Sequence, residues 1–222
     1  MFEQNRAIDA SIVTRFLAFQ SGVVCDALGR LDLAGWMTGI RPIRPKSKMV
    51  GRARTLSFGR KRGTPPADLN MYAAIRACNP GDVLVIGTER CEGWIYGENV
   101  AHTAQYQGLA GIVTDAAARD GAELAELSIP CFAHGVETRP PFDIEIIAAD
   151  VPIDCGGAQV RPGDLVCGDT DGIVVVPGNR IEDVLRQAED LNLLEKAQED
   201  AIARKAPLPE IHEILKKKKT PK

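Results

Sequence analysis

The sequence lacks several features that mark common classes of protein. Its N-terminus has no cationic start followed by an unbroken apolar core, because Glu3 and Asp9 interrupt the apolar residues, so we expect no signal peptide. No stretch is long and apolar enough to span a bilayer. The net charge of -3 gives none of the basic footprint that nucleic-acid-binding proteins carry. These absences predict a cytoplasmic protein that binds neither membranes nor nucleic acid.

The cysteines never show the C-x-x-C spacing of zinc sites and redox motifs. They stand singly at positions 25, 78, 91, 131, 155 and 167. In a chain of this size this pattern is typical of reduced, mostly buried thiols, so zinc and disulfide frameworks are disfavoured. One alternative stays open: Cys131 lies near the candidate site residues and would be a nucleophile if a histidine paired with it.

No break in composition divides the chain, so we expect one domain over residues 1–222. Apolar periodicity predicts two helices within residues 10–29 and a long helix from Ile181 to Lys205, followed by a short helix that ends at Lys216. Another helix is predicted from Asp68 to Cys78, with Asp68 as its N-cap.

Two Pro-Gly-Asp turns, at residues 80–82 and 162–164, each precede a buried apolar strand. We expect both strands in the same mixed sheet and expect the two aspartates to have structural roles. Residues 40–58 contain prolines and alternating side chains, which predicts strands at a sheet edge.

The stretch from Gly97 to Leu124 carries the densest set of candidate functional residues. It is predicted to form a short helix, a glycine turn and a strand at residues 109–114, because that last segment is small, apolar and β-prone. Gly97 followed by Glu98 leaves free N–H groups at the positive end of the helix dipole. Such an arrangement suits an anion.

An arginine–aspartate pair follows that strand. The guanidinium of Arg119 fits a carboxylate, and the hard oxygens of Asp120 fit a divalent cation. The same pair without further context is a surface ion pair, which contributes little to stability. Both interpretations stay open on spacing alone.

Several spaced motifs, taken in order, resemble those of one protein family. Its pattern is a glycine near a helix start, then G-x-x-G-[IV]-V-x-D, then R-D-x-x-[ED]; the chain carries these at Gly97, residues 108–115 and residues 119–123. Further matches lie at residues 80–85, 130–136, 156–157, 160–166 and 168–177. On these motifs, which cover about residues 23–194, the chain resembles the family that holds the 4-hydroxy-4-methyl-2-oxoglutarate aldolases and the regulators of ribonuclease activity A (the RraA-like family).

This resemblance implies a swivelling β/β/α fold, which is an α/β architecture of mixed sheets flanked by helices, with a long helical C-terminal extension over residues 181–222. It also implies a homo-oligomer, either a trimer or a hexamer, with active sites between subunits. In the implied 2-oxo acid pocket, Arg119 holds the substrate carboxylate. Backbone amides complete that pocket, and they belong to Gly97, Glu98, Asn99 and Val100.

The aldolases of this family use magnesium or manganese, held largely through waters and one aspartate, whose counterpart is Asp120. Glu98 corresponds to the acidic residue that positions the catalytic water. A glutamate from the C-terminal helix of a neighbouring subunit corresponds to Glu195, with Glu199 as the alternative. The resemblance thus implies a metal-dependent, class II aldolase, in which the metal stabilises the charge of a pyruvate enolate.

The expected substrate is a 4-hydroxy-2-oxo acid of the 4-hydroxy-4-methyl-2-oxoglutarate or 4-carboxy-4-hydroxy-2-oxoadipate type. Oxaloacetate decarboxylation is expected as a side activity, because it passes through the same enolate. A Schiff-base route is disfavoured, since Lys46, Lys48 and Lys61 lie in polar loop contexts. The alternative from another class is a non-catalytic regulator of ribonuclease activity that acts by binding protein. Such regulators tend to lose part of the metal-binding set, which this chain keeps.

The chain departs from the family pattern at two positions. Asp115-Ala116 replaces a common Asp-Gly, which predicts a different turn before Arg119. Asp68 stands where an asparagine is common, which changes the expected substrate contacts. The lysine run at residues 216–219 is predicted to be a solvated, frayed end.

Overall fold

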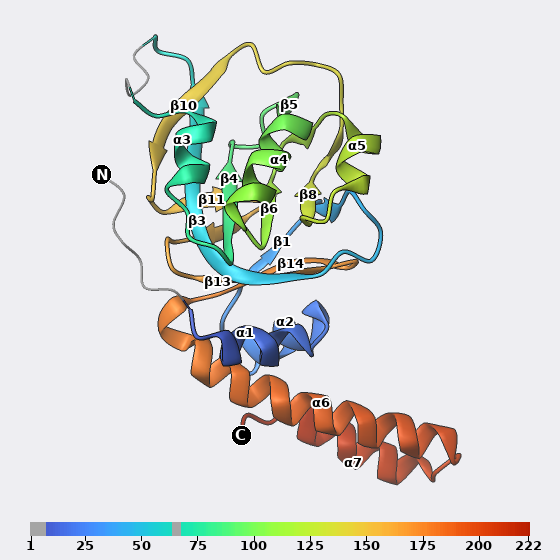
Figure 1. The fold of residues 1–222 in the computed structure, drawn as a ribbon. Coiled ribbons are helices and arrows are strands. Elements are labelled where there is room, and N and C mark those ends of the chain that lie inside the picture. The colour runs from blue at the N-terminus through green and yellow to red at the C-terminus, as the bar shows by residue number, and fades with distance from the viewer. Residues whose placement is uncertain (1–7, 64–67) are drawn as a thin grey trace.

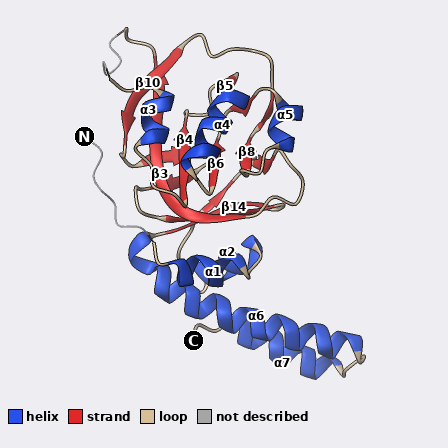
Figure 2. Ribbon diagram, in the orientation of Figure 1, coloured by secondary structure: helices blue, strands red, loops and turns tan. Residues whose placement is uncertain are grey.

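The structure is a computed structural model that describes residues 8–63 and 68–222. One group of helices covers a face of the main sheet, and a second group lies below the sheet in the same view (Figures 1 and 2). The helices of the described residues are α1 (Ala10–Leu17), α2 (Ser21–Gly29), α3 (Met71–Arg76), α4 (Glu98–Gln107), α5 (Gly121–Glu126), α6 (Ile181–Ala203) and α7 (Leu208–Lys218), with a 3-10 turn η1 (Gly178–Arg180) before α6. The strands are β1 (Trp36–Met37), β2 (Arg41–Pro42), β3 (Met49–Arg60), β4 (Asp82–Gly87), β5 (Trp94–Tyr96), β6 (Gly111–Thr114), β7 (Ala117–Ala118), β8 (Cys131–Ala133), β9 (Gly135–Val136), β10 (Ile144–Ala149), β11 (Ile153–Cys155), β12 (Ala158–Val160), β13 (Leu165–Asp169) and β14 (Gly172–Val176).

The main sheet is mixed and has nine strands in the order β1-β14-β13-β3-β4-β6-β8-β2, with β10 also paired to β3. Neighbours among β3, β4, β6 and β8 run parallel, and the other pairs are antiparallel. Every residue of β4 and of β6 is buried, as expected for parallel strands covered on both faces. The predicted α/β fold with mixed sheets and a long C-terminal helix is confirmed.

The long strand β3 lies inside the sheet and not at its edge. It pairs with β13 and β10 along one side and with β4 along the other. The prediction of edge strands over residues 40–58 is therefore wrong for β3. Of the strands within residues 40–58, β2 is the one at an edge, and it contains Pro42. A proline removes one N–H donor, so it indicates an edge for its own strand and not for the next one.

Each of the two Pro-Gly-Asp turns leads directly into a strand of this sheet, as predicted. The Asp82 carboxylate accepts the N–H of Asn79 at 2.8 Å, and the Asp164 carboxylate accepts the N–H of Arg161 at 2.8 Å. Each aspartate thus closes its own turn, and β4 and β13 follow directly. These contacts give both aspartates structural roles.

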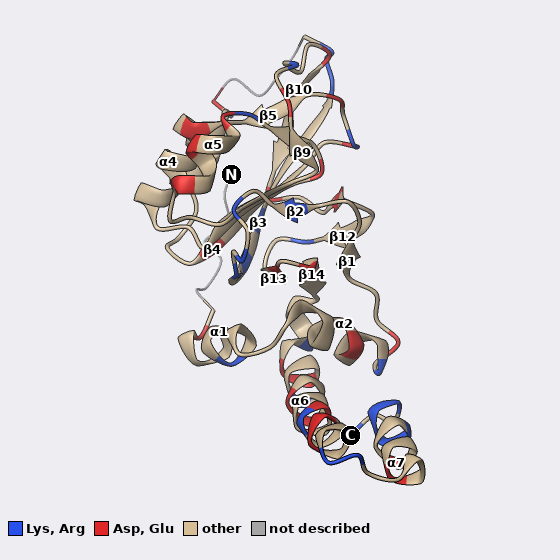
Figure 3. Ribbon diagram, turned by 90° about the vertical axis from the view of Figure 1, so that its right-hand side faces the viewer, with Lys and Arg blue, Asp and Glu red and all other residues tan. Residues whose placement is uncertain are grey.

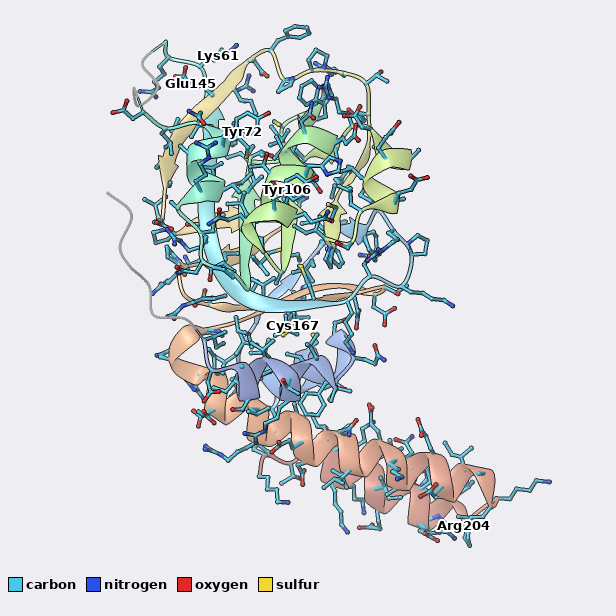
Figure 4. All side chains as sticks on the ribbon, in the orientation of Figure 1. Lys61, Tyr72, Tyr106, Glu145, Cys167 and Arg204 are labelled. Carbon is cyan, nitrogen blue, oxygen red and sulfur yellow. The ribbon has the colours of Figure 1, made fainter. Side chains whose placement is uncertain are left out.

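Two helices open the described chain, as the apolar spacing predicts. Helix α2 is held to the end of β13, because Asp169 accepts both the N–H and the hydroxyl of Ser21 at 2.6 Å. Helices α1, α2 and α6 bury a cluster against β13 and β14 that includes Phe16 and Leu185. Cys167, labelled in Figure 4, belongs to this cluster and lies between the sheet and the helices.

Helix α3 begins later than the sequence pattern predicts. Its N-cap is Asn70, whose Oδ1 accepts the N–H of Ala73 at 2.9 Å. The prediction of Asp68 as the N-cap is wrong, because Asp68 lies three residues before the first helical residue, Met71. An asparagine therefore does precede this helix, but it is Asn70 and lies two residues after position 68, where the family pattern has one.

Helix α7 folds back along α6, and the pair projects away from the sheets (Figure 1). Acidic residues gather on α6 and basic residues on α7 (Figure 3). The lysine run forms the last turn of α7, where cations are favoured by the helix dipole.

Arg30, whose side chain is only 3% exposed, fixes the end of α7. It donates hydrogen bonds to the carbonyls of Lys217 and Lys218, both at 2.8 Å, and to Asp190 of α6 at 2.9 Å. The last carbonyls of a helix have no partner within it, so Arg30 satisfies two of them. Gln187 bonds the N–H and the carbonyl of Lys222 in addition. The prediction of a frayed lysine end is therefore wrong.

No single described helix is long and apolar enough to cross a membrane. Helices α1 and α2 together reach the length and apolar composition of a membrane span, but they are bent by 103° relative to each other. The expected lack of a signal peptide also concerns residues 1–7, which lie outside the described residues. The cytoplasmic location stays a prediction.

Arg30→Ala should release the C-terminal segment. The substitution removes a buried cation and, with it, the hydrogen bonds that Arg30 donates to Asp190 and to two helix carbonyls. The free energy of unfolding should therefore fall by about 3 kcal/mol. Urea denaturation and trypsin cleavage at the lysine run measure the two effects.

The matched control is Arg15→Ala, which also removes an arginine paired with an acidic residue of α6. Its partner is Glu189, and both side chains are more than 40% exposed, so the loss should stay below about 1 kcal/mol. Equal cleavage rates for the Arg30 variant and the unmodified protein would contradict the role given to Arg30.

Candidate active site

Three short parallel strands bring the candidate site residues together. In the small sheet β5-β7-β9, Tyr96 aligns with Ala118, and Ala118 aligns with Val136. The N–H of Arg119 donates to the Tyr96 carbonyl at 3.0 Å, and the N–H of Glu137 donates to the Ala118 carbonyl at 2.9 Å. The strands therefore end level, and the residues that follow them lie side by side at one edge.

Gly97 leaves room at this edge for the side chains of Arg119 and Asp120. A Cβ atom there would lie 2.5 Å from Asp120 Oδ2 and 2.8 Å from Arg119 Cγ. The φ of Gly97 is -142°, which is extended backbone that any residue adopts. Space and not backbone conformation therefore explains the glycine.

Helix α4 begins directly after Gly97, as predicted. The first N–H group of this helix is hydrogen-bonded to a carboxylate of the protein itself. The N–H of Glu98 donates to Asp120 Oδ2 at 3.2 Å, so the chain's own carboxylate occupies part of the predicted anion site. The amides of Asn99 and Val100 belong to the same first turn, whose N–H groups have no partner within the helix.

The guanidinium of Arg119 has a fixed orientation. Its central carbon lies 4.1 Å from the centre of the Trp94 ring, a cation–π contact, and its Nε lies 3.4 Å from Asp120 Oδ2. The ring holds one face and Asp120 holds the Nε side, which leaves the two terminal nitrogens for an incoming carboxylate. Arg119 and Asp120 are half-exposed, so a small molecule can reach both.

Asp120 adopts the left-handed backbone conformation, with φ 57° and ψ 47°. This conformation is uncommon outside glycine, although aspartate tolerates it better than most residues. Such strain costs about 1–3 kcal/mol and gathers at functional sites. The Glu98 amide and the Arg119 side chain hold the carboxylate on the side of α4.

Arg119 and Asp120 line an open pocket of about 640 Å³, whose lining does not include Glu98. Its lining combines two arginines, two carboxylates, a hydroxyl and two apolar side chains: Trp94, Arg119, Asp120, Val136, Glu137, Thr138 and Arg139. A second pocket of about 390 Å³ shares Glu137 with the first and includes Ala116, the position that departs from the family pattern. Ala116 itself is 1% exposed and belongs to the core beneath.

A model of the RraA-like family, described as Aldolase/RraA, matches residues 21–175. The chain belongs to the RraA-like family. Its relatives include a protein of Halalkalibacterium halodurans named "Putative 4-hydroxy-4-methyl-2-oxoglutarate aldolase", 33% identical over 88% of this chain and 90% of that protein.

Two solved structures share the fold of this RraA-like protein. One is RraAS2 of Streptomyces coelicolor, described as an unusual member of the RNase ES inhibitor RraA family, with 29% identity and a TM-score of 0.80 over 88% of this chain and 98% of that one. The other comes from Pseudomonas syringae pv. tomato, with 24% identity and a TM-score of 0.82 over 94% of this chain and 100% of that one. The second likeness shows the fold alone.

The donor atoms at the site fit a hydrated divalent metal. Among the described residues, no group of three or more His, Cys, Asp or Glu side chains is placed to hold a metal ion. The contacts of Asp120 with α4 and Arg119 both use Oδ2, which leaves Oδ1 for an outside ligand. Mg²⁺ commonly keeps several waters and takes one or two carboxylates, so one hard carboxylate is enough to hold it.

Glu195 lies away from this site within its own chain. It is on the projecting α6–α7 pair, where Lys218 Nζ contacts its Oε1 at 3.3 Å (Figure 1). Glu199, the alternative, is exposed one turn further along α6. A role for either residue in a neighbouring subunit's site stays a prediction.

Cys131 is not placed to act as a nucleophile. Its side chain is buried in the core, and burial raises the pKa of the thiol to about 12. The thiolate is the reactive form, so a buried thiol with a raised pKa is inert. All six cysteines are free thiols, and four of them are buried, in agreement with the prediction of reduced, mostly buried thiols.

The structure adds three residues that the sequence reasoning missed. Trp94 supports Arg119, Glu137 follows the third strand, and His102 contacts Glu98 from one turn further along α4, with Nε2 at 3.3 Å from Oε1. The four-residue spacing of His102 from Glu98 on a predicted helix was a usable signal. The other two depend on strand register, which no local pattern reveals.

Gly97→Ala should disrupt the site without unfolding the protein. The new Cβ would displace the side chains of Asp120 and Arg119, whereas the extended backbone accepts alanine. We expect metal affinity, measured by Mn²⁺ titration, to fall about 10-fold or more, as when groups that orient a ligand are displaced.

The control is Gly22→Ala in α2, where a Cβ would meet nothing within 4 Å. That change should leave Mn²⁺ binding unaltered and raise stability by about 0.5–1 kcal/mol. Unchanged Mn²⁺ affinity in the Gly97 variant would show that the close approach is not needed for binding.

Proposed function

We propose that this RraA-like protein is a divalent-metal-dependent aldolase that cleaves a 4-hydroxy-2-oxo acid and releases pyruvate. The observation that carries the proposal is the placement of Arg119, oriented by Trp94, beside Asp120 in one open pocket. A guanidinium beside a hard carboxylate suits a substrate that has a carboxylate and also binds a metal. The substrate class is that of 4-hydroxy-4-methyl-2-oxoglutarate or 4-carboxy-4-hydroxy-2-oxoadipate.

In this proposal Arg119 binds the carboxylate next to the 2-oxo group through its two terminal nitrogens. A water oriented by Glu98 takes the proton of the 4-hydroxyl group, and the oxygen forms a carbonyl at C4 as the bond between C3 and C4 breaks. The electron pair of that bond forms the enolate of pyruvate, and the C4 fragment leaves as the second carbonyl product. The same water then delivers a proton to the enolate methylene. Asp120 would hold Mg²⁺ or Mn²⁺, and the bound metal would supply Lewis-acid stabilisation of negative charge on the oxo oxygen.

We further propose that the working form is a trimer or a hexamer, in which Glu195 serves the site of a neighbouring subunit. The projecting α6–α7 pair supports this, because it carries exposed apolar side chains far from its own site: Leu193, Ile202, Leu208 and Leu215. Exposed apolar surface on a projecting element is typical of a contact with another molecule.

Regulation of a ribonuclease by protein binding is the alternative. It rests on the similarity to RraAS2. A stoichiometric ribonuclease complex that survives Asp120→Ala, together with no pyruvate release, would favour this alternative over the aldolase.

Pyruvate release should require a divalent metal. With 4-hydroxy-4-methyl-2-oxoglutarate or oxaloacetate as substrate, coupling to lactate dehydrogenase should show turnover with Mg²⁺ or Mn²⁺ and none after chelation. The proposal fails if no 2-oxo acid of this class yields pyruvate under either metal.

Asp120→Ala should lower kcat/KM by about 10³-fold or more, because it removes the carboxylate assigned to the metal, a change of about 4 kcal/mol in transition-state stabilisation. Arg119→Lys should raise KM and lower kcat, so that kcat/KM falls about 10- to 100-fold, because lysine cannot bind a carboxylate bidentately.

The control for both variants is Asp143→Asn, which changes an exposed carboxylate outside this pocket and should keep full activity. Full activity in both site variants would show that the site is elsewhere.

A further inference from the structure

Among the described residues, the side chain of Glu98 has its polar contact with His102. This histidine lies one helical turn after Glu98, and its Nε2 is 3.3 Å from Glu98 Oε1. A carboxylate oxygen can only accept, so this contact requires a proton on Nε2. The other ring nitrogen, Nδ1, is buried and has no hydrogen-bond partner among the described residues. The neutral ring therefore carries its proton on Nε2.

A second contact fixes the plane of this ring. Tyr106, one further turn along α4, stacks on His102 with ring centres 5.8 Å apart and planes 19° apart. Tyr106 is 81% exposed, so its ring adds little to the core (Figure 4). Stacking from one side and the buried Nδ1 edge favour the orientation in which Nε2 points to Glu98.

We propose that His102 is a positioning residue that holds the Glu98 carboxylate for its work on the catalytic water. Its Nε2–H occupies Oε1, which leaves Oε2 for the water. The Glu98 amide is meanwhile bonded to Asp120. Main chain and side chain of Glu98 are thus both anchored, one to the carboxylate assigned to the metal and the other to His102. This inference rests on the proposed function for the role of Glu98.

The same contact also occurs as an ordinary pair four residues apart on a helix, which stabilises the helix only slightly. The two roles differ in what they change. A helix pair affects thermal stability, whereas a positioning residue affects kcat and leaves KM unchanged, because substrate binding uses Arg119.

Two substitutions separate these roles. Glutamine keeps an N–H donor at the distance of Nε2, whereas the shorter asparagine does not reach Glu98. We expect His102→Asn to lower kcat for pyruvate release about 10- to 100-fold at unchanged KM, and His102→Gln to keep kcat within a factor of about three. Equal kcat values for the two variants would overturn the proposal.

Gln105→Ala is the control on the same helix. Gln105 accepts hydrogen bonds from Ser128 and Ile129 and does not contact Glu98, so its loss should lower the melting temperature without changing kcat. A fall in kcat equal to that of His102→Asn would show that the effect is general loosening of α4.

A measurement without substrate tests the contact itself. In ¹⁵N NMR spectra of the whole protein, the neutral form of His102 should show the Nε2–H tautomer, and Glu98→Ala should shift the Nε2 resonance, because that N–H loses its acceptor. An Nδ1–H tautomer overturns the proposal whatever the activity. An Nε2 resonance that Glu98→Ala leaves unchanged would also overturn the proposal. If the unmodified protein released no pyruvate, the proposed function would fail, while the tautomer would still support or refute the His102–Glu98 contact.

Discussion

The level ends of β5, β7 and β9 are the constraint on which the site depends. Main-chain hydrogen bonds from Arg119 to Tyr96 and from Glu137 to Ala118 set that register. A shift of one residue in β7 would turn the Arg119 side chain to the opposite face of the small sheet. Because Gly97 has no side chain, the end of β7 can then lie against the start of α4. Strand register and one missing Cβ together bring a guanidinium, a carboxylate and a helix N-terminus into contact.

Local patterns in the sequence were enough to predict most elements of the fold. Buried strands such as β4 and β14 are short apolar runs bounded by glycine, proline and aspartate, and these signals act within a few residues. Predictions failed where the answer depended on distant parts of the chain. β3 is interior because β13 and β10, more than eighty residues away, pair with it. The lysine run is ordered because its carbonyls accept hydrogen bonds from Arg30, which lies near the other end of the sequence.

The candidate site shows the same division. Motifs pointed to Arg119 and Asp120 because a guanidinium suits a carboxylate and a carboxylate suits a divalent cation, wherever the residues lie in the fold. The orientation of Arg119 depends on Trp94, which is twenty-five residues earlier and meets it only through the pairing of β5 with β7. The partner of the Glu98 amide was also hidden, since Asp120 fills a position that the sequence suggested for a substrate anion. Residue types therefore indicated a candidate pair, and strand register decided which atoms meet.

The anchoring of the C-terminus by Arg30 has a consequence for the order of folding. The two bonded groups, Arg30 Nε and the Lys218 carbonyl, are 188 residues apart in sequence. During synthesis Arg30 emerges long before its acceptors in α7, so this guanidinium stays hydrated until α7 has been made. Closing so long a loop is entropically unfavourable unless the sheet between the two ends has already formed. The docking of α7 should therefore be a late event, and it joins α2, α6 and α7 into one cooperative unit.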